Sequence, residues 1–86
     1  MEFEFDEKKS RINKTKHGID FVEAQSLWDD ADLLEIPART VDEPRTIVIG
    51  TIAQKAWSAI VTLRGERTRI ISVRPARKEE RQFYES

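Results

Sequence analysis

The stretch that decides the fold is TIVIGTI at Thr46–Ile52, followed by AWSAIVTL at Ala56–Leu63 and TRIISV at Thr68–Val73. Each run is six to eight residues long and rich in β-branched side chains, which favour extended backbone. The connecting segments, AQK and RGER, are short enough for antiparallel hairpins. The second half of the chain therefore predicts an antiparallel meander of three strands.

The segments before the meander predict one strand and two helices. Phe3 and Phe5 alternate with acidic residues, which is the period of a half-buried strand. A first helix should begin after Asp6, which can cap it, and end at Gly18, a typical left-handed stop. A second should begin at Asp20, another capping residue. The apolar residues on the sheet-facing side of that second helix are Phe21, Ala24, Leu27 and Trp28.

Two further elements complete the expected fold. Leu33 to Thr40 reads as an edge strand, because Pro37 cannot donate to a sheet ladder. Pro75 lies where a last helix could begin, and Arg77 to Tyr84 is charged and helical in pattern. The expected order is β-α-α-β-β-β-β-α, an α+β fold with a mostly antiparallel sheet. At 86 residues, the chain should form one domain over residues 1–86.

Composition excludes several classes of protein. The chain has no cysteine and one histidine, so disulfide frameworks, thiolate zinc sites and His-rich metal sites are excluded, and we expect neither metal nor cofactor. No apolar stretch approaches the roughly 20 residues of a membrane span. The acidic, alternating N-terminus does not resemble a signal peptide. We therefore expect a cytoplasmic protein without membrane contact.

The net charge of −1 conceals a strong division along the chain. Residues 1–44 carry 6 Lys or Arg against 12 Asp or Glu, whereas residues 45–86 carry 9 against 4. Two basic segments, residues 8–16 and 64–81, flank an acidic one at residues 20–43. Arginine dominates the second basic segment and is suited to two-pronged contact with phosphate. Segments of opposite sign can also simply neutralise each other in the folded protein.

The last strand and helix suggest a specific anion site. Strict alternation predicts that Ile70, Ser72 and Arg74 share one face of the strand, with Ile71 and Val73 on the other. An arginine beside core-like neighbours needs an anionic partner or a wet cleft. The helix would add Arg77, Arg81 and Tyr84 at i, i+4 and i+7, with Glu80 beside them. Such a cleft suits a phosphodiester: the arginines would hold the phosphate, and Glu80 or Tyr84 would transfer protons. The 2′-OH of RNA would be the nucleophile, with no metal required.

Motifs in the same order along most of the chain resemble the BrnT family of bacterial type II toxin–antitoxin toxins. Phe3-Glu4-Phe5-Asp6, followed by Asn13, Lys16-His17-Gly18-Ile19, Phe21 and Glu23-Ala24, is similar to F-x-W-D and N-x-x-K-H-G-I/V-x-F-x-E-A. Arg45 and Gly50 match R-x-x-x-x-G. Arg69 to Arg77, then Glu80-Arg81 and Tyr84, is similar to R-I-I-S-A-R-x-A…E-R…Y. Phe5 departs from the usual Trp, and Pro75 interrupts the junction between strand and helix.

The resemblance implies a RelE-like fold and a metal-independent endoribonuclease that halts translation. It also implies a BrnA-like antitoxin, bound as a 2:2 heterotetramer, that neutralises the toxin and brings it to operator DNA for autorepression. The catalytic residues that it suggests are Arg74, Glu80, Arg81 and Tyr84. The candidate RNA-binding residues are Lys16, His17, Arg64, Arg69 and Arg77.

Alternative interpretations remain for several of these residues. His17 is a possible general base. An imidazolium in the last turn of a helix also stabilises that helix by about 0.3–1 kcal/mol, through its interaction with the helix dipole. Trp28 and Trp57 are better explained by packing in the core or against a partner than by stacking on bases. The chain could also be a non-catalytic interaction module whose basic face binds an acidic antitoxin segment.

Overall fold

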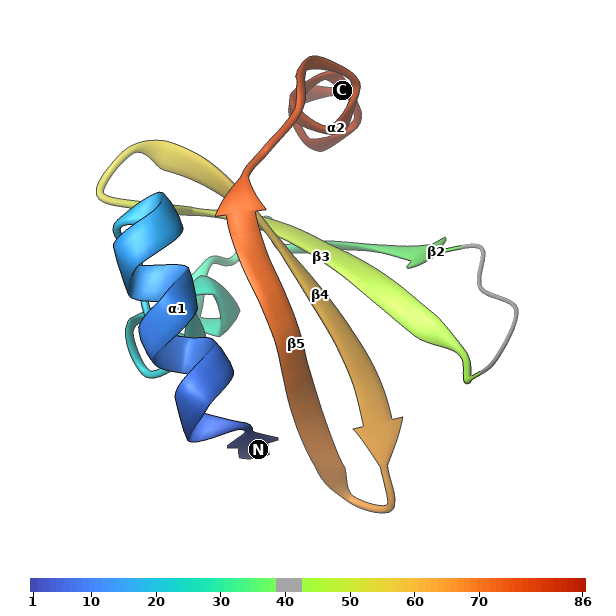
Figure 1. Cartoon of the computed structure of the whole chain (residues 1–86). Helices are drawn as coiled ribbons and strands as arrows, with labels where there is room; N and C mark the ends of the chain where they lie inside the picture. The colour runs from blue at the N-terminus through green and yellow to red at the C-terminus, as the bar shows by residue number, and fades with distance from the viewer. Residues whose placement is uncertain (39–42) are drawn as a thin grey trace.

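The computed structural model describes residues 1–38 and 43–86 and has the predicted order of elements (Figure 1). The α+β class and the expected sequence of strands and helices are confirmed. The elements are β1 (Glu2–Phe5), α1 (Glu7–His17), η1 (Glu23–Asp29), β2 (Leu34–Ala38), β3 (Arg45–Ile52), β4 (Lys55–Arg64), β5 (Arg67–Pro75) and α2 (Lys78–Glu85). No helix of the described residues is long and apolar enough to cross a membrane.

The five strands form one sheet in the order β1-β5-β4-β3-β2. The pairs β2–β3, β3–β4 and β4–β5 are antiparallel, which confirms the meander, whereas β1 runs parallel to β5. Pro37 lies in β2, at the edge of the sheet as predicted. Thr40, the predicted end of that strand, lies outside the described residues.

Helices α1 and η1 cover one face of the sheet, which we call the core face, and α2 lies over one end of the other face (Figure 1). Phe21, Ala24 and Leu27 are at most 1% exposed and pack against Val48 and Val73. The aromatic residues flanking this core are Trp57, 7% exposed, and Trp28, whose ring meets Phe3 edge-on at 4.8 Å. Both tryptophans therefore pack in or against the core, as expected.

The second helix is a 3₁₀ helix rather than an α-helix. Asp20 and Glu23 bond reciprocally as the capping pattern predicts: each side chain accepts from the other's backbone N–H, at 2.7 and 2.9 Å. The predicted start at Asp20 was wrong, however, because these bonds close a turn before the helix, which begins at Glu23 with Val22 at its N-cap position. The buried residues Phe21, Ala24 and Leu27 recur every three positions, which matches the three residues per turn of a 3₁₀ helix. The tighter winding places Ala24 and Leu27 on the side of η1 that faces the sheet, in line with Phe21, which precedes the helix. Packing on the sheet therefore explains the difference.

Helix α1 is capped as predicted but held to the sheet by polar side chains. Asp6 accepts from the backbone N–H groups of Lys8 and Lys9, and Gly18 has φ = 82°. Inside the helix Asn13 and Ser10 are buried, at 7% and 4% exposure. Asn13 accepts from the backbone N–H of Val73 in β5, and Ser10 accepts from the backbone N–H of Phe21. Polar contacts thus anchor a helix whose single aliphatic residue, Ile12, is exposed.

A β-bulge in β5 overturns the predicted face assignment. Val61 pairs with Ile70 and Ile60 with Ser72, so Ile71 is an extra residue in β5. Because of this insertion, Ile70 and Val73 both belong to the core. The prediction that Ile70 shares a face with Ser72 and Arg74 was wrong, since strict alternation does not continue through a bulge. Arg74 lies opposite Ser58, on the face that carries α2.

Pro75 does not begin the last helix. It is the final residue of β5, paired with Trp57, and α2 begins at Lys78 with Arg77 as its N-cap. Proline is tolerated there because it ends the strand. The two residues that follow, Ala76 and Arg77, direct the chain so that α2 lies across the sheet near Ser58.

Candidate functional site

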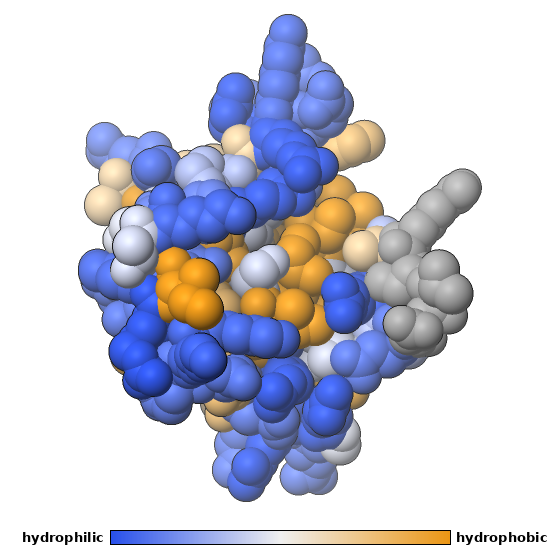
Figure 2. Space-filling view, in the orientation of Figure 1, coloured by the Kyte–Doolittle hydropathy of each residue, from blue (hydrophilic) through white to orange (hydrophobic). Residues whose placement is uncertain are grey.

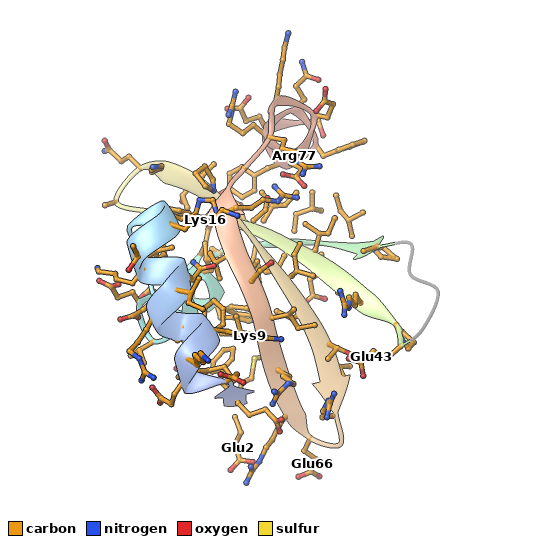
Figure 3. All side chains as sticks on the ribbon, in the orientation of Figure 1. Glu2, Lys9, Lys16, Glu43, Glu66 and Arg77 are labelled. Atoms are coloured by element: carbon orange, nitrogen blue, oxygen red, sulfur yellow. The ribbon has the colours of Figure 1, made fainter. Side chains whose placement is uncertain are left out.

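A cleft of about 290 Å³ lies between α1 and β5. Its charged and titratable lining comes from Lys9, Lys16 and His17 of α1 and Arg74 of β5. Lys9 and Lys16 reach from α1 toward β5 (Figure 3). The rest of the lining consists of Ile12, Asn13, Phe21, Ile71, Ser72 and Val73. Within residues 1–38 and 43–86, neither lysine forms an ion pair with a carboxylate, so the cleft carries a net positive charge.

The early end of β1 creates this cleft. Phe5 is the last residue of β1 and pairs with Ile70, so β5 beyond this point has no strand on its outer side. Helix α1 takes that place, and the side chain of Asn13 accepts a hydrogen bond from the Val73 N–H at 3.2 Å. Asn13 also donates to the carbonyl oxygen of Ile19 at 2.8 Å. One amide thus fixes α1 against the edge of β5 and against the chain that follows α1.

The spacing along α1 explains which cations face the cleft. Lys9, Asn13 and Lys16 are separated by four and three residues, which places them on one side of an α-helix. His17 follows, half-buried, in the last turn. Lys9 is a site residue that the sequence reasoning missed. The signal was its position one turn before Asn13, whose amide marks the buried side of α1.

Arg74 and Glu80 form a two-pronged ion pair at the end of the cleft. Nη1 and Nη2 of Arg74 lie 2.7 and 2.8 Å from Oε1 and Oε2 of Glu80. The side chains are 21% and 12% exposed. The Glu80 carboxylate raises the pKa of the Arg74 guanidinium above its usual value. The structure thus brings together Arg74 and Glu80, two of the four predicted catalytic residues.

Glu80 is held in place by two further donors. Its Oε1 accepts from the hydroxyl of Ser58 at 2.9 Å and from the backbone N–H of Arg77 at 2.7 Å. The Arg74 guanidinium, together with these hydrogen bonds, lowers the pKa of Glu80 to about 2, against the cost of partial burial. Glu80 is therefore a carboxylate at neutral pH, with no proton to donate.

Tyr84 lies one turn further along α2 and contacts a different group. Its hydroxyl donates to Oδ2 of Asp30, which also accepts from the backbone N–H of Thr51 at 2.9 Å and its hydroxyl at 3.1 Å. The Tyr84 hydroxyl and backbone N–H groups hold the pKa of Asp30 at about 2, and the Asp30 carboxylate raises the pKa of Tyr84. Tyr84 does not line the cleft and instead ties α2 to the end of η1.

The remaining predicted residues lie outside the cleft. Nη1 of Arg81 donates to the carbonyl oxygen of Ala76 at 2.9 Å, and Arg77 caps α2 with its side chain exposed (Figure 3). Arg69 pairs with Glu4 at 2.8 Å, and Arg64 with Glu43 at 3.5 Å. Arg69 precedes Arg74 by five residues, about 16 Å along the strand. Of the five residues predicted to share one cleft, Arg74 and Glu80 therefore meet, whereas Arg77, Arg81 and Tyr84 make other contacts.

The described part of the chain contains no cluster of three His, Asp or Glu side chains arranged to hold a metal ion. The sequence reasoning also missed Ser58, which holds Glu80, and Asp30, which holds Tyr84. Both lie far from α2 in the sequence. Only the pairing of β4 with β5, and the end of η1, brings them to α2, so no local pattern could have indicated them.

Comparison with known proteins identifies the family to which the chain belongs. A search of curated proteins finds no match. The family model described as "Ribonuclease toxin, BrnT, of type II toxin-antitoxin system" matches residues 5–80. That range covers α1, the whole sheet after β1, and the Arg74–Glu80 pair, and it stops before Arg81 and Tyr84. With most of its length matched, the chain belongs to the BrnT family of ribonuclease toxins from type II toxin–antitoxin systems.

Proposed function

We propose that the protein is a metal-independent endoribonuclease that cleaves RNA in the cleft between α1 and β5. The observation that carries this proposal is the convergence of Lys9, Lys16, His17 and Arg74 on one cleft of about 290 Å³. Positively charged groups attract the phosphodiester and stabilise the negative charge that develops on its oxygens. Imidazole is the side chain that most readily transfers protons near neutral pH.

In this mechanism the 2′-OH of RNA attacks the adjacent phosphorus, and its proton passes to His17. The bond from phosphorus to the 5′ oxygen breaks, and that oxygen takes a proton from the imidazolium. The products are a 2′,3′-cyclic phosphate and a free 5′-OH. Arg74 binds the non-bridging oxygens through the N–H groups that Glu80 leaves available, while Lys9 and Lys16 hold neighbouring phosphates.

The hydrogen bonds favour positioning roles for Glu80 and Tyr84. Glu80 fixes the plane of the Arg74 guanidinium, because both of its oxygens contact that group. Tyr84 fixes α2, which carries Glu80, through its bond to Asp30. The proton-transfer roles suggested for these two residues by the sequence remain untested, and the ionised state of Glu80 favours His17 instead.

The cellular role that we propose follows from the family. The protein would act in the cytoplasm, with a RelE-like fold, and inhibit translation by cleaving RNA. A BrnA-like antitoxin would neutralise it in a 2:2 heterotetramer. That complex would repress its own operon, with operator DNA contacted only through the antitoxin. The type II toxin–antitoxin family supports an antitoxin partner, and the basic cleft supports RNA as substrate.

The test is cleavage of RNA by the purified chain, freed from its antitoxin, in the presence of EDTA. We expect wild-type protein to cleave and Arg74→Lys to lose at least about tenfold in kcat/KM, about 1.4 kcal/mol. Lysine preserves a charge opposite Glu80 but cannot make the two-pronged contact. The matched control is Arg11→Ala, an exposed cation of α1 outside the cleft. Circular dichroism verifies that each variant is folded.

A second variant separates proton transfer from phosphate binding. His17→Gln should lower kcat at least about a hundredfold while KM changes little, because general acid–base catalysis contributes about 10²–10⁴. Full activity of Arg74→Lys would remove Arg74 from the site. A folded wild-type chain that binds RNA or antitoxin but never cleaves would favour the non-catalytic interaction module.

A further inference from the structure

The sheet face that carries α2 has an uncovered apolar strip. Ile36, Ile47 and Ile60 are adjacent in register across β2, β3 and β4, and all three are partly exposed. Their neighbours on the core face, Val48 and Ala59, are at most 1% exposed. An apolar area is visible in the middle of this side of the molecule, below hydrophilic α2 (Figure 2). We call these three residues, together with Ile71, the apolar strip.

Helix α2 covers only one end of this face. It lies over Ser58, which bonds Glu80, and beside Ile49, which is fully buried and pairs with Ser58. Ile47 and Ile60 are one pleat further along β3 and β4, and in the described ranges no other helix lies over them. The strip is therefore a partly exposed apolar surface bordered by α2 at one end.

The strip leads into the basic cleft. Ile71, the extra residue of the bulge, stands with Ser72 opposite Ile60 and lines the cleft with Lys9 and Lys16. On the side away from α2, Arg45 is exposed two residues from Ile47, on the same face of β3. Lys9, Lys16 and Arg45 form no ion pair with a described carboxylate. Cations that pair with no carboxylate of residues 1–38 and 43–86 thus flank the apolar strip at two places.

We propose that this strip docks an acidic amphipathic segment of the antitoxin, which runs over the four isoleucines and ends in the basic cleft. The chemistry of the face fixes the occupant: aliphatic anchors for the strip, and carboxylates for Arg45, Lys9 and Lys16. Four strands span about 14 Å, which matches a helix of about ten residues. By filling the cleft, the segment excludes RNA and so neutralises the enzyme. This inference rests on the proposed function.

The chain has no cysteine, so single introduced thiols can report which face the antitoxin covers. Ile47→Cys places a thiol on the apolar strip. Leu63→Cys places one on an exposed aliphatic position of the opposite face, where Leu63 is 74% exposed. Each variant reacts with a maleimide, alone and in the presence of the cognate antitoxin. We expect the antitoxin to slow labelling at position 47 more than tenfold and to leave labelling at position 63 unchanged.

Two further measurements complete the test. Ile47→Asp should weaken the complex at least a hundredfold and preserve RNA cleavage, with Leu63→Asp as the control that keeps full affinity. An RNA oligonucleotide carrying 2′-O-methyl groups should leave labelling at position 47 unchanged. If it protects that thiol as well as the antitoxin does, the strip is an RNA surface and the proposal fails.

The outcomes separate this inference from the proposed function. A complex that forms while the thiol at position 47 reacts at its free rate overturns the docking face and leaves the enzyme proposal standing. Absence of any complex overturns the docking face and the antitoxin partner together. RNA cleavage by the free chain is measured independently of both and decides the enzymatic part alone.

Discussion

Asn13 is the residue on which the attachment of α1 depends most. The helix has few apolar side chains, and Ile12, its largest aliphatic residue, is 56% exposed. The amide of Asn13 instead satisfies two backbone groups, the N–H of Val73 and the carbonyl of Ile19. A buried N–H or C=O without a partner costs about 1–3 kcal/mol.

We therefore predict that Asn13→Ala lowers the free energy of unfolding by about 2–4 kcal/mol, because both backbone groups lose their partner. Urea denaturation followed by circular dichroism measures this difference. The control is Thr15→Ala on the exposed side of the same helix, which should change stability by less than about 0.5 kcal/mol. Equal effects of the two substitutions would contradict the role given to Asn13.

Glu80 makes the stability of the protein depend on pH. Its pKa in the folded protein is about 2, below the ordinary value of 4.5, so folding favours the ionised form. Its contribution to stability is therefore fully present above about pH 5 and is lost as pH falls toward 2. Asp30, with a pKa of about 2, acts in the same direction.

The corresponding prediction compares wild type with Glu80→Gln over a pH series. At pH 7 the variant should be less stable by about 2 kcal/mol, since the Arg74 guanidinium loses its charged partner. The difference should shrink steadily below pH 5, because wild-type Glu80 becomes neutral as well. Unfolding free energies at pH 7, 5, 4 and 3 test it, and a difference independent of pH would refute the assignment.

At the scale of elements, the β3–β4 hairpin contains a turn that the sequence does not fit well. The strands extend further than predicted, so the connection is only Ala53-Gln54 rather than three residues. Both residues have positive φ, 50° and 70°. A two-residue turn of this kind favours Asn-Gly, because side chains other than Asn, Asp and Gly are strained there.

We predict that Ala53→Asn combined with Gln54→Gly stabilises the protein by about 1 kcal/mol, or about 4–8 °C in Tm. The opposite experiment uses Gly65 in the β4–β5 turn, where φ is 62° and an added methyl group would meet no atom within 4 Å. Gly65→Ala should lower stability by about 1 kcal/mol through backbone strain alone. Thermal unfolding measures both, and a lower Tm for the Asn-Gly pair would disprove the turn argument.

At the scale of the whole molecule, the division of charge has a simple structural outcome. Arg69 and Arg64 of the basic half pair with Glu4 and Glu43 of the acidic half. Part of the opposite charge of the two halves is thus neutralised locally, by ion pairs between them. The cations of the cleft remain outside these pairs, so the positive charge available to RNA is local.

This localisation predicts a shallow dependence of RNA affinity on salt. Three phosphate contacts, from Lys9, Lys16 and Arg74, give a slope of log K against log salt of about −2 for a single strand. Affinity for a 2′-O-methyl RNA should fall about 20-fold between 50 and 200 mM salt. Lys9→Ala should make the slope shallower by about 0.7, and Arg11→Ala should not. A wild-type slope of −5 or steeper would show that the whole basic half binds RNA.

The sequence by itself determined what depends on neighbouring residues. Asp6 and Gly18 mark the two ends of α1, and the β-branched runs from Thr46 to Val73 form the meander. Both could be predicted because helix caps and strand preference act over a few residues. It also determined the division of charge and, through the motifs around His17 and Arg74, the family.

Only the tertiary structure decided how these parts make a site. The bulge at Ile71 turns Arg74 away from Ile70, and packing against the sheet winds η1 as a 3₁₀ helix. The early end of β1 places α1, and with it Lys9, beside β5. Each of these outcomes depends on contacts between residues far apart in the chain. Local preference is too weak to fix such contacts, and the burial of the shared core is what selects them.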